Sequence, residues 1–280
     1  MSEHRPFISV VIAVLNRVDT VREAIESVRE QQFPDKELLV IDGGSTDGTV
    51  EAVRDFAGDL SYFESRPDLG IAHAWNKALA VARGQWILFL GADDSLWDRN
   101  VLDRVVPHLQ EAEGKALVVF GEVACRGRDG RVIEIYNQRW SRRRFLRYGM
   151  NLSHQGVFHH KSLFEHCGPF DETFRIAADY ELLLRWIKNH DPLPLKGMTV
   201  CGVRHGGMSS DPHHAMATLR EFERARRKNG LEGVTSVWRW SMFKASLKAG
   251  LFRAFGPKTA CTLVDAYRIV TGRPRKWTRV

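Results

Sequence analysis

The 280-residue sequence has few cysteines and no long apolar stretch. Its four cysteines, Cys125, Cys167, Cys201 and Cys261, are scattered, and no C-x-x-C pair occurs. This spacing suggests neither a zinc site nor a disulfide framework, so reduced thiols are expected. No apolar run reaches the roughly 18 residues that a membrane-spanning helix needs. The first residues lead directly into a strand-like run and do not resemble a signal peptide, so a cytoplasmic location is expected.

The sequence also lacks internal repeats and low-complexity linkers, and acidic residues are scarce in its last quarter. From residue 215 onward, 15 Lys and Arg face 4 Asp and Glu, whereas residues 1–214 carry 26 basic and 30 acidic residues. The net charge of +7 therefore comes from the tail. This asymmetry predicts that the tail contacts an anionic surface, either a membrane or a nucleic acid.

One stretch combines a buried strand with two adjacent carboxylates. The apolar run Trp86–Leu90 leads through Gly91 and Ala92 into Asp93 and Asp94. Such a run suits a strand buried on both faces, and open α/β sheets bind ligands beyond the carboxyl ends of their strands. Two adjacent acids repel each other, so a divalent cation with a diphosphate on its far side would satisfy them. The alternative is an Asp-Asp-Ser helix cap.

Strand-like and helix-like segments alternate through the first hundred residues. This alternation predicts an α/β fold with a Rossmann-like, mostly parallel central sheet flanked by helices. The expected strands cover residues 7–14, 37–42, 60–65 and 85–90, and the expected helices cover 19–31, 49–56 and 70–82. After residue 100 the pattern loosens, with strands expected at 116–124, 131–136, 156–159 and 195–203, and helices at 101–109, 162–166, 178–189, 215–228 and 236–255.

Six stretches in a fixed order resemble the family 2 glycosyltransferases, the inverting enzymes of the GT-A fold. They are SVVIAVLNR, LLVIDGGSTDGT, SRPDLGIAHAWNKAL, WILFLGADD, SHQGVFHHKSLFEHCGPFDETFRIAADYELLLRW and GGMSS, and they span roughly residues 7–210. The resemblance implies a GT-A domain over 1–214, with a donor half at about 1–100 and an acceptor half at about 101–214. Residues 215–280 would form a basic helical extension.

The resemblance also implies residues that bind the nucleotide-sugar donor. They are Ala13 and Asn16 in the loop after the first strand, Asp42, Asp68, Asn76, and Asp93 facing the ribose or the sugar. A carboxylate only accepts hydrogen bonds, so Asp42 suits an imide N–H or a ribose hydroxyl. Asp42 would otherwise cap the turn before Gly43, and Asn76 would otherwise be a solvated helix residue.

By the same resemblance, Asp94 is the ligand of a metal ion. A departing nucleoside diphosphate gains negative charge, which Mg²⁺ or Mn²⁺ stabilises as a Lewis acid. Ala92 stands where the family's motif has an acid, and Asp94 occupies the last, metal-binding position. His205 would complete a Mn²⁺ shell or contact a phosphate, or be a structural histidine.

Asp179 matches the family's catalytic base, with Ala178 in place of the usual preceding glutamate. Inversion in one displacement needs a base that takes the proton of the acceptor hydroxyl. Asp is also among the best helix caps, and the two roles are compatible. The substitution at 178 leaves open which neighbour sets the pKa of this base. His154 and Gln155 match elements on the acceptor side, although His154 would alternatively be structural.

The tail contains an amphipathic pattern. Phe243, Leu247, Leu251 and Phe255 recur every four residues, with Lys244, Lys248 and Arg253 beside them. Such helices lie on anionic membranes, and the tryptophans at 238, 240 and 277 suit the headgroup level. The alternative is a helix that docks on the main domain by its apolar stripe.

The sequence thus predicts an inverting glycosyltransferase that uses a nucleotide-diphospho-sugar, with UDP as the expected nucleotide, and a glycan or polyprenyl-linked acceptor. The tail would hold it at the inner face of the cytoplasmic membrane, with no nucleic-acid partner. One rival is a sugar-nucleotidyltransferase, but the loop Val14–Arg17 lacks the glycine run expected of it. The other is a non-enzymatic membrane- or nucleic-acid-binding module, which leaves the aspartates unexplained.

Overall fold

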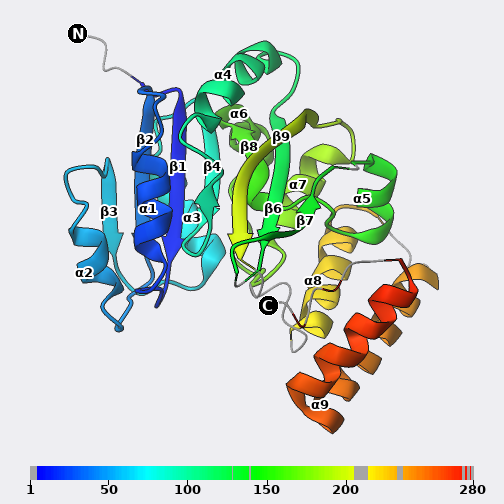
Figure 1. The fold of residues 1–280 in the computed structure, drawn as a ribbon. Helices are drawn as coiled ribbons and strands as arrows, with labels where there is room; N and C mark the ends of the chain where they lie inside the picture. Colours follow the sequence, from blue (N-terminus) through cyan, green and yellow to red (C-terminus); the bar gives the residue numbers. More distant parts are fainter. Residues whose placement is uncertain are drawn as a thin grey trace.

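The computed structural model describes residues 5–127, 129–138, 140–204, 214–231, 236–272, 275 and 278. One mixed sheet runs through the molecule in the order β3-β2-β1-β4-β8-β6-β9-β5, and β7 pairs with β6 (Figure 1). The strands are β1 (Ile8–Val14), β2 (Lys36–Asp42), β3 (Tyr62–Ser65), β4 (Trp86–Gly91), β5 (Ser95–Leu96), β6 (Val118–Arg126), β7 (Val132–Tyr136), β8 (Val157–His160) and β9 (Leu193–Arg204). The helices are α1 (Val21–Arg29), α2 (Thr49–Arg54), α3 (Ile71–Val81), α4 (Val101–Ala112), α5 (Arg142–Tyr148), α6 (Lys161–Cys167), α7 (Ala178–Ile187), α8 (Ala215–Lys228) and α9 (Ser236–Val270).

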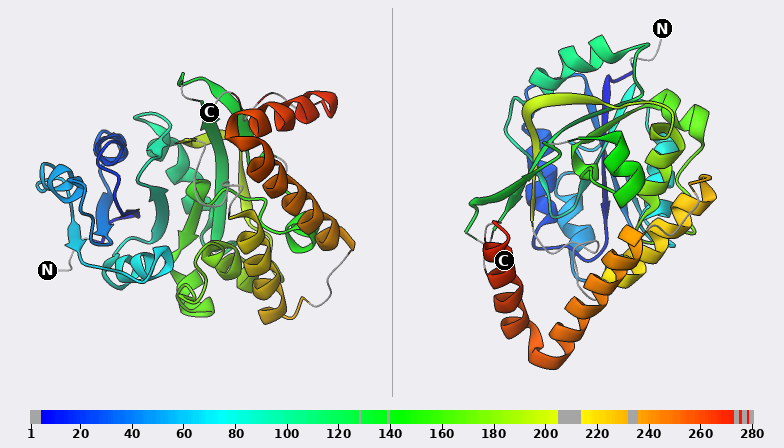
Figure 2. Two further views of the ribbon diagram at one scale, coloured as in Figure 1. Left: turned by 90° about the horizontal axis from the view of Figure 1, so that it is seen from below. Right: turned by 90° about the vertical axis from the view of Figure 1, so that its right-hand side faces the viewer.

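The first half of the sheet is parallel, as the alternating pattern predicts. β1 pairs with β2 on one side and β4 on the other, and Ala13 faces both Ile41 and Gly91 in register. All seven residues of β1 are buried. Helices cover both faces of the sheet (Figure 2), which explains why these strands are continuously apolar rather than alternating. Their carboxyl ends therefore meet at one edge.

The second half of the sheet departs from the parallel pattern. β8 lies antiparallel between β4 and β6, while the long β9 runs parallel to β6. The mostly parallel α/β fold predicted from the sequence is confirmed. β5 and α5 were not expected, because two strand residues and a seven-residue arginine-rich helix carry almost no periodic signal.

Helix α8 packs against the main domain. Its Ala225 is fully buried in a core cluster, and its Phe222 ring lies 4.7 Å from the ring of Tyr180 on α7. The boundary expected between residues 214 and 215 would separate two helices that pack together. We propose that the main domain includes α8 and that the basic extension begins with α9.

Helix α9 consists of two helical arms that meet at Gly256. The φ of +71° at Gly256 is non-helical and lies in a region that favours glycine, so the chain bends there. α9 lies beyond α8, below the β6 and β7 side of the sheet and to one side of β1, β2 and β3 (Figure 1). Among the described helices, none has both the length and the apolar character needed to cross a membrane. All four cysteines are free thiols.

Candidate functional site

The loop after β1 and the turn after β2 are joined by hydrogen bonds. The backbone N–H of Asn16 donates to Ser45 Oγ at 2.7 Å, and the Asn16 amide oxygen accepts from the Thr46 N–H at 2.9 Å. Asn16 has φ of +52°, a conformation that asparagine tolerates better than most residues. Asn16 is exposed at the carboxyl edge of the sheet, where the sequence predicts donor binding. Ala13, by contrast, lies within β1 and is nearly buried rather than in the loop.

Asp42 ends β2 with a fully buried carboxylate. Its Oδ2 accepts the N–H groups of Gly44 and Ser45, each at 3.0 Å, and the Ser65 hydroxyl at 2.7 Å. Its Oδ1 accepts the Ser45 hydroxyl. The bonds from Gly44 and Ser45 are the turn contacts that the alternative interpretation expects, and the bond from Ser65 joins Asp42 to β3. A nucleotide hydroxyl or imide would share or replace one of these donors, so donor binding by Asp42 stays a prediction.

The two carboxylates after β4 fold back over Gly91. A Cβ added at Gly91 would collide with Asp94 Oδ2 and lie 3.1 Å from Asp93 Oδ1, so this position needs a residue without a side chain. Asp94 is nearly buried, whereas Asp93 is half-buried. Arg17 Nε lies 4.0 Å from Asp93 Oδ2, a long and exposed pair worth less than about 1 kcal/mol. The loop after β1 therefore faces the segment that follows β4.

The Asp94 carboxyl is in an unfavourable position for a charge. Burial and the adjacent Asp93 charge raise the pKa of Asp94 to about 7, against opposing hydrogen bonds from the Arg204 backbone and the Gln155 side chain. A hard cation would relieve both causes of the shift. His205, the expected second ligand, follows Arg204 and lies outside the described residues.

The side chains available to bind a metal ion suit a cation that keeps water and phosphate ligands. Across the described residues, no group of three or more His, Cys, Asp or Glu side chains is placed to hold a metal ion. Mg²⁺ and Mn²⁺ bind through one or two carboxylates when substrate phosphates complete the shell. Asp94, with Asp93 beside it, fits that kind of site and does not fit a structural metal centre.

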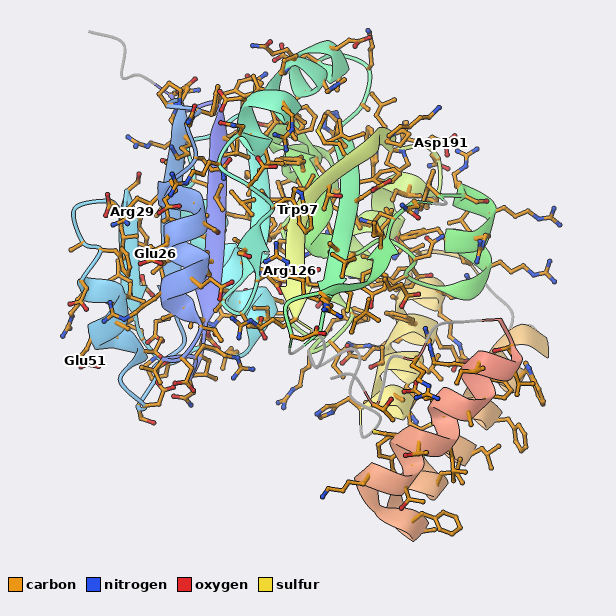
Figure 3. The ribbon with its side chains drawn as sticks, in the orientation of Figure 1. Glu26, Arg29, Glu51, Trp97, Arg126 and Asp191 are labelled. Carbon is orange, nitrogen blue, oxygen red and sulfur yellow. The ribbon has the colours of Figure 1, made fainter. Side chains whose placement is uncertain are left out.

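The basic side chain of Arg126 extends from the end of β6 over the neighbouring strand β9. The Arg126 guanidinium carbon is 4.9 Å from the ring centroid of Trp97, and Figure 3 labels both side chains. A Cβ at Gly202 would be only 2.8 Å from Arg126 Nε, so the guanidinium packs over the backbone of β9. Its charge and that of Asp94 act in opposite directions on the pKa of Cys201, which burial raises.

Asp179 lines a cavity of about 610 Å³. Other lining residues come from α3, the segment after β7, the segment before β8, and α8. They are Ile71, Trp75, Tyr136, Asn137, Met150, Asn151, Leu152, Ser153, His154, Gln155, Arg175, Ile176, Thr218 and Phe222. The structure thus brings His154 and Gln155 to the same cavity as Asp179. This volume is in the range of small-molecule sites.

Asp179 lies in the first turn of α7, where Ala177 occupies the cap position. Its Oδ1 accepts the Tyr180 N–H at 2.7 Å. Burial raises the pKa of Asp179 to about 6, and the charge of Glu221 adds to the increase, while the Tyr180 N–H opposes it. A carboxylate with this pKa is a stronger base than an ordinary one and is still ionised at neutral pH.

Glu221 on α8 holds the segment that leads into Asp179. Its carboxylate accepts the N–H groups of Arg175 at 3.0 Å, Ile176 at 2.8 Å and Ala177 at 2.9 Å. Ala178 removes the acid that the family's motif would have there, and Glu221 provides a second carboxylate from another helix. Burial is the main cause of the raised pKa of Asp179, and Glu221 is a neighbour whose charge adds to it.

His154 belongs to a buried aromatic cluster. Its ring stacks on Phe89 at 5.4 Å and lies 4.8 Å from the Trp75 ring and 5.0 Å from the His159 ring. Burial and the nearby His159 keep the pKa of His154 well below its usual range, so the ring is neutral. His154 therefore forms part of the cavity wall as an aromatic ring, and its structural role is evident.

Asp68 and Asn76, which the sequence predicts to bind the nucleotide-sugar, make hydrogen bonds and packing contacts within the protein. Asp68 Oδ1 accepts the Gly70 N–H at 2.8 Å, and a Cβ at Gly43 would lie 2.6 Å from Asp68 Oδ2, so Asp68 packs against the turn after β2. The Asn76 amide donates to Phe170 O and Glu172 Oε1 and accepts the Phe170 N–H, which uses both its N–H groups and its oxygen. These contacts give Asn76 a structural role, and nucleotide binding by it is an unsupported prediction.

Sequence reasoning missed Glu221 and most of the cavity wall. Trp75, Met150 and Phe222 come from three separate parts of the chain. No local motif marks them. The alanine at position 178 left open which neighbour sets the pKa of Asp179, and it gave no indication of where that neighbour lies.

Comparison with known proteins agrees with this geometry. Residues 9–165 match the family described as "Glycosyl transferase family 2". A PGL/p-HBAD biosynthesis glycosyltransferase of Mycobacterium tuberculosis is 33% identical over 187 residues, covering 66% of this chain and 71% of the relative. A putative colanic acid biosynthesis glycosyl transferase of Escherichia coli K12 is 26% identical over 252 residues, covering 81% and 86%.

Solved structures show the same fold. TarS of S. aureus in complex with UDP-GlcNAc has a TM-score of 0.62 at 18% identity, covering 91% of this chain and 75% of that one. A mannosyltransferase from Pyrobaculum calidifontis in complex with GDP-Man and Mn²⁺ has a TM-score of 0.60 at 20% identity, covering 99% and 84%. The chain belongs to glycosyl transferase family 2 and is a nucleotide-sugar-dependent glycosyltransferase with a GT-A-like fold.

Proposed function

We propose that the protein transfers a sugar, with inversion, from a UDP-sugar to a hydroxyl of a glycan or lipid-linked acceptor. The observation that carries this proposal is the cavity that contains Asp179, a carboxylate whose pKa of about 6 suits a general base. The donor would lie at the carboxyl edge of β1, β2 and β4, between Asn16, Asp42, Asp68 and Asp93.

In this reaction the acceptor hydroxyl oxygen bonds to the anomeric carbon as the bond from that carbon to the diphosphate breaks. Asp179 takes the hydroxyl proton, and Glu221 keeps the segment before it in place. Trp75 and Phe222 supply aromatic surface to the cavity that would hold the acceptor. Asp94 would hold Mg²⁺ or Mn²⁺, which would stabilise the charge of the leaving diphosphate as a Lewis acid. His205 remains the proposed second ligand.

Two features support an acceptor with an apolar part. Ile71, Trp75, Met150 and Phe222 give the cavity apolar and aromatic walls, which suit the face of a sugar ring or a hydrophobic aglycone. Asp179 and Arg175 provide polar groups on the same wall.

Calorimetric titration tests the donor class. UDP, GDP and their common sugar conjugates would be titrated into the protein with Mn²⁺ and then with a chelator. We expect binding of UDP and of one UDP-sugar that depends on the metal, because the Asp94 carboxylate repels a diphosphate unless a cation lies between them. Metal-independent binding would contradict the cofactor assignment, and selective GDP binding would contradict the choice of uridine. Absence of any binding by the folded protein would remove the donor proposal.

Gly91→Ala should weaken donor binding without removing a functional group. The added methyl would collide with the Asp94 carboxylate, which must then shift. Disturbing the position of a metal ligand typically costs about 10–100-fold in metal affinity, and we expect a loss of this size. The measurement is the Mn²⁺-dependent affinity for UDP. Gly58→Ala is the matched control, because a Cβ there meets no atom within 4 Å. Equal affinities of the two variants would contradict the assigned position of Asp94.

Glu221→Gln should shift the acid limb of the pH–rate profile to lower pH. The Glu221 charge raises the pKa of Asp179, so its removal lowers that pKa and keeps the base ionised in more acidic solution. In the unchanged enzyme, the rate should fall about tenfold per pH unit below about pH 6, where Asp179 becomes protonated.

Besides Glu221, the charged or titratable groups near Asp179 are Arg175, His154 and Tyr136 in the lining of the cavity and Tyr180 next to it. Burial raises the pKa of Tyr136, so this phenol is neutral. His154 and Tyr180 are neutral at neutral pH, since burial lowers the pKa of the first and raises that of the second to about 12. Glu223→Gln is the control, because Glu223 on the same helix pairs with Arg227 instead. An unchanged acid limb in Glu221→Gln would show that Glu221 only supports the fold.

A further inference from the structure

Helix α9 carries an exposed apolar face. Eight of the thirteen large apolar side chains that are exposed in the described residues lie on this helix. On the arm before Gly256, Trp240, Phe243, Leu247 and Phe255 are each 55–58% exposed. Their spacing of three, four and eight residues places them on one side of a helix. The alternative interpretation, in which this stripe docks on the main domain, does not hold for these four exposed side chains.

The arm after Gly256 continues the pattern. Leu263, Tyr267 and Val270 are 45%, 64% and 86% exposed and follow one another by four and three residues. On this second arm Ala260 and Asp265 are buried, so the helix is held to the body while its apolar face stays exposed. Ser246 Oγ donates to Met216 Sδ on α8 at 3.4 Å, and Arg268 lies 3.8 Å from Glu134 on β7. Figure 2 shows the two arms projecting from the body as a V.

The charge of this segment favours one kind of occupant. Residues 236–280 contain ten Lys and Arg and a single acid, Asp265. Asp265 is buried and accepts two hydrogen bonds from Thr278. A second copy of this chain would bring the same positive charge against it, which opposes self-association through α9. A nucleic acid would match the charge but leave the apolar stripe in water.

We propose that α9 docks flat on an anionic lipid bilayer, with the face of Trp240, Phe243, Leu247 and Phe255 at the boundary between headgroups and acyl chains. A basic helix with such a face lies in the plane of the interface and does not cross the membrane. The arm of residues 236–255 is about 30 Å long at 1.5 Å per residue, which is enough for a stable flat contact. Basic residues each add about 1 kcal/mol near an anionic surface.

The position of α9 connects docking with the cavity. Thr218 and Phe222 on α8 line the cavity, and α8 contacts α9 through Met216. α9 projects in the direction in which β1 to β4 run, but on the α8 side of the molecule (Figure 1). Docking would hold this end of the protein near the bilayer and favour an acceptor anchored in lipid. This consequence rests on the proposed function, whereas the docking itself does not.

Vesicle sedimentation tests the proposal. The full chain would be mixed with vesicles of phosphatidylcholine alone and of phosphatidylcholine with phosphatidylglycerol. We expect binding to the anionic vesicles that weakens with added salt. The double variant Phe243→Glu/Leu247→Glu should bind at least about tenfold more weakly. Each substitution removes an apolar side chain that the bilayer would bury and adds a negative charge that an anionic surface repels. The matched control is Val132→Glu/Leu193→Glu, which makes the same changes at exposed positions on β7 and β9.

Circular dichroism and UDP titration would show that both double variants are folded, so loss of docking is distinguishable from loss of the donor site. Equal vesicle binding by the two double variants would overturn the proposal, as would failure of the unchanged protein to bind anionic vesicles. A dimer in light scattering that only Phe243→Glu/Leu247→Glu dissociates would assign the face to a second copy and also overturn it. Binding to duplex RNA without binding to vesicles would do the same.

Discussion

Asp179→Asn is expected to reduce turnover by about 10²–10⁴-fold, the usual contribution of a general base, while leaving UDP-sugar affinity unchanged. Asparagine keeps the size of the side chain and can still accept the Tyr180 N–H, but its amide cannot take a proton from the acceptor. Asp179 lies in the cavity rather than at the edge where the donor would bind. The loss should therefore appear in kcat and spare the donor dissociation constant.

The measurements are steady-state kinetics on the acceptor and calorimetric titration of UDP. Asp191→Asn provides the control, because Asp191 is an exposed acid that pairs with Arg142 at 3.4 Å, away from the cavity. Near-normal turnover of Asp179→Asn would show that another group is the base. A parallel loss of UDP binding would instead place Asp179 in the donor site.

Asp94→Asn is expected to remove the metal-dependent part of UDP binding. Loss of an outer contact at a metal site typically costs about 10–100-fold in affinity, and loss of a direct ligand should cost at least as much. The variant should show the same UDP affinity with Mn²⁺ as with chelator. Calorimetry in the two conditions measures the difference.

The same substitution should not destabilise the protein when metal is absent. Burial and Asp93 make the Asp94 charge unfavourable in the fold, so a neutral amide of the same size removes that cost. Thermal unfolding in chelator should therefore occur at an equal or higher temperature. Glu111→Gln is the control, because Glu111 is an exposed acid on α4 that belongs to neither the proposed donor site nor the proposed metal site. A metal-dependent affinity that survives in Asp94→Asn would exclude Asp94 as the ligand.

Local patterns in the sequence were enough to predict the parallel half of the sheet. The apolar run Trp86–Leu90 is buried within β4, and the alternation of strands and helices continues through residue 100. Because parallel strands bring their carboxyl ends to one edge, the sequence also predicted that Asn16, Asp42 and Asp94 lie along that edge. Each of these features depends on residues close together in the chain.

The role of Asp42 shows where local reasoning stopped. The sequence allowed both a nucleotide contact and a turn cap, and the structure shows the hydrogen bonds of the cap together with one from Ser65. Asn76 is similar, because its partner Phe170 lies 94 residues away and could not be identified from the helix that carries Asn76. A side chain's residue type limits the partners that it can have, but the packing decides which one it meets.

The sequence by itself determined that strands end in carboxylates at one edge, that α7 begins near an aspartate, and that the tail is basic with an apolar stripe. Only the tertiary structure decided that Glu221 reaches the segment before Asp179, that Trp75 and Phe222 enclose the same cavity, and that the α9 stripe stays exposed. Periodicity and residue chemistry are properties of short segments, whereas these contacts join residues tens to more than a hundred positions apart. They form only when the sheet and its helices have packed.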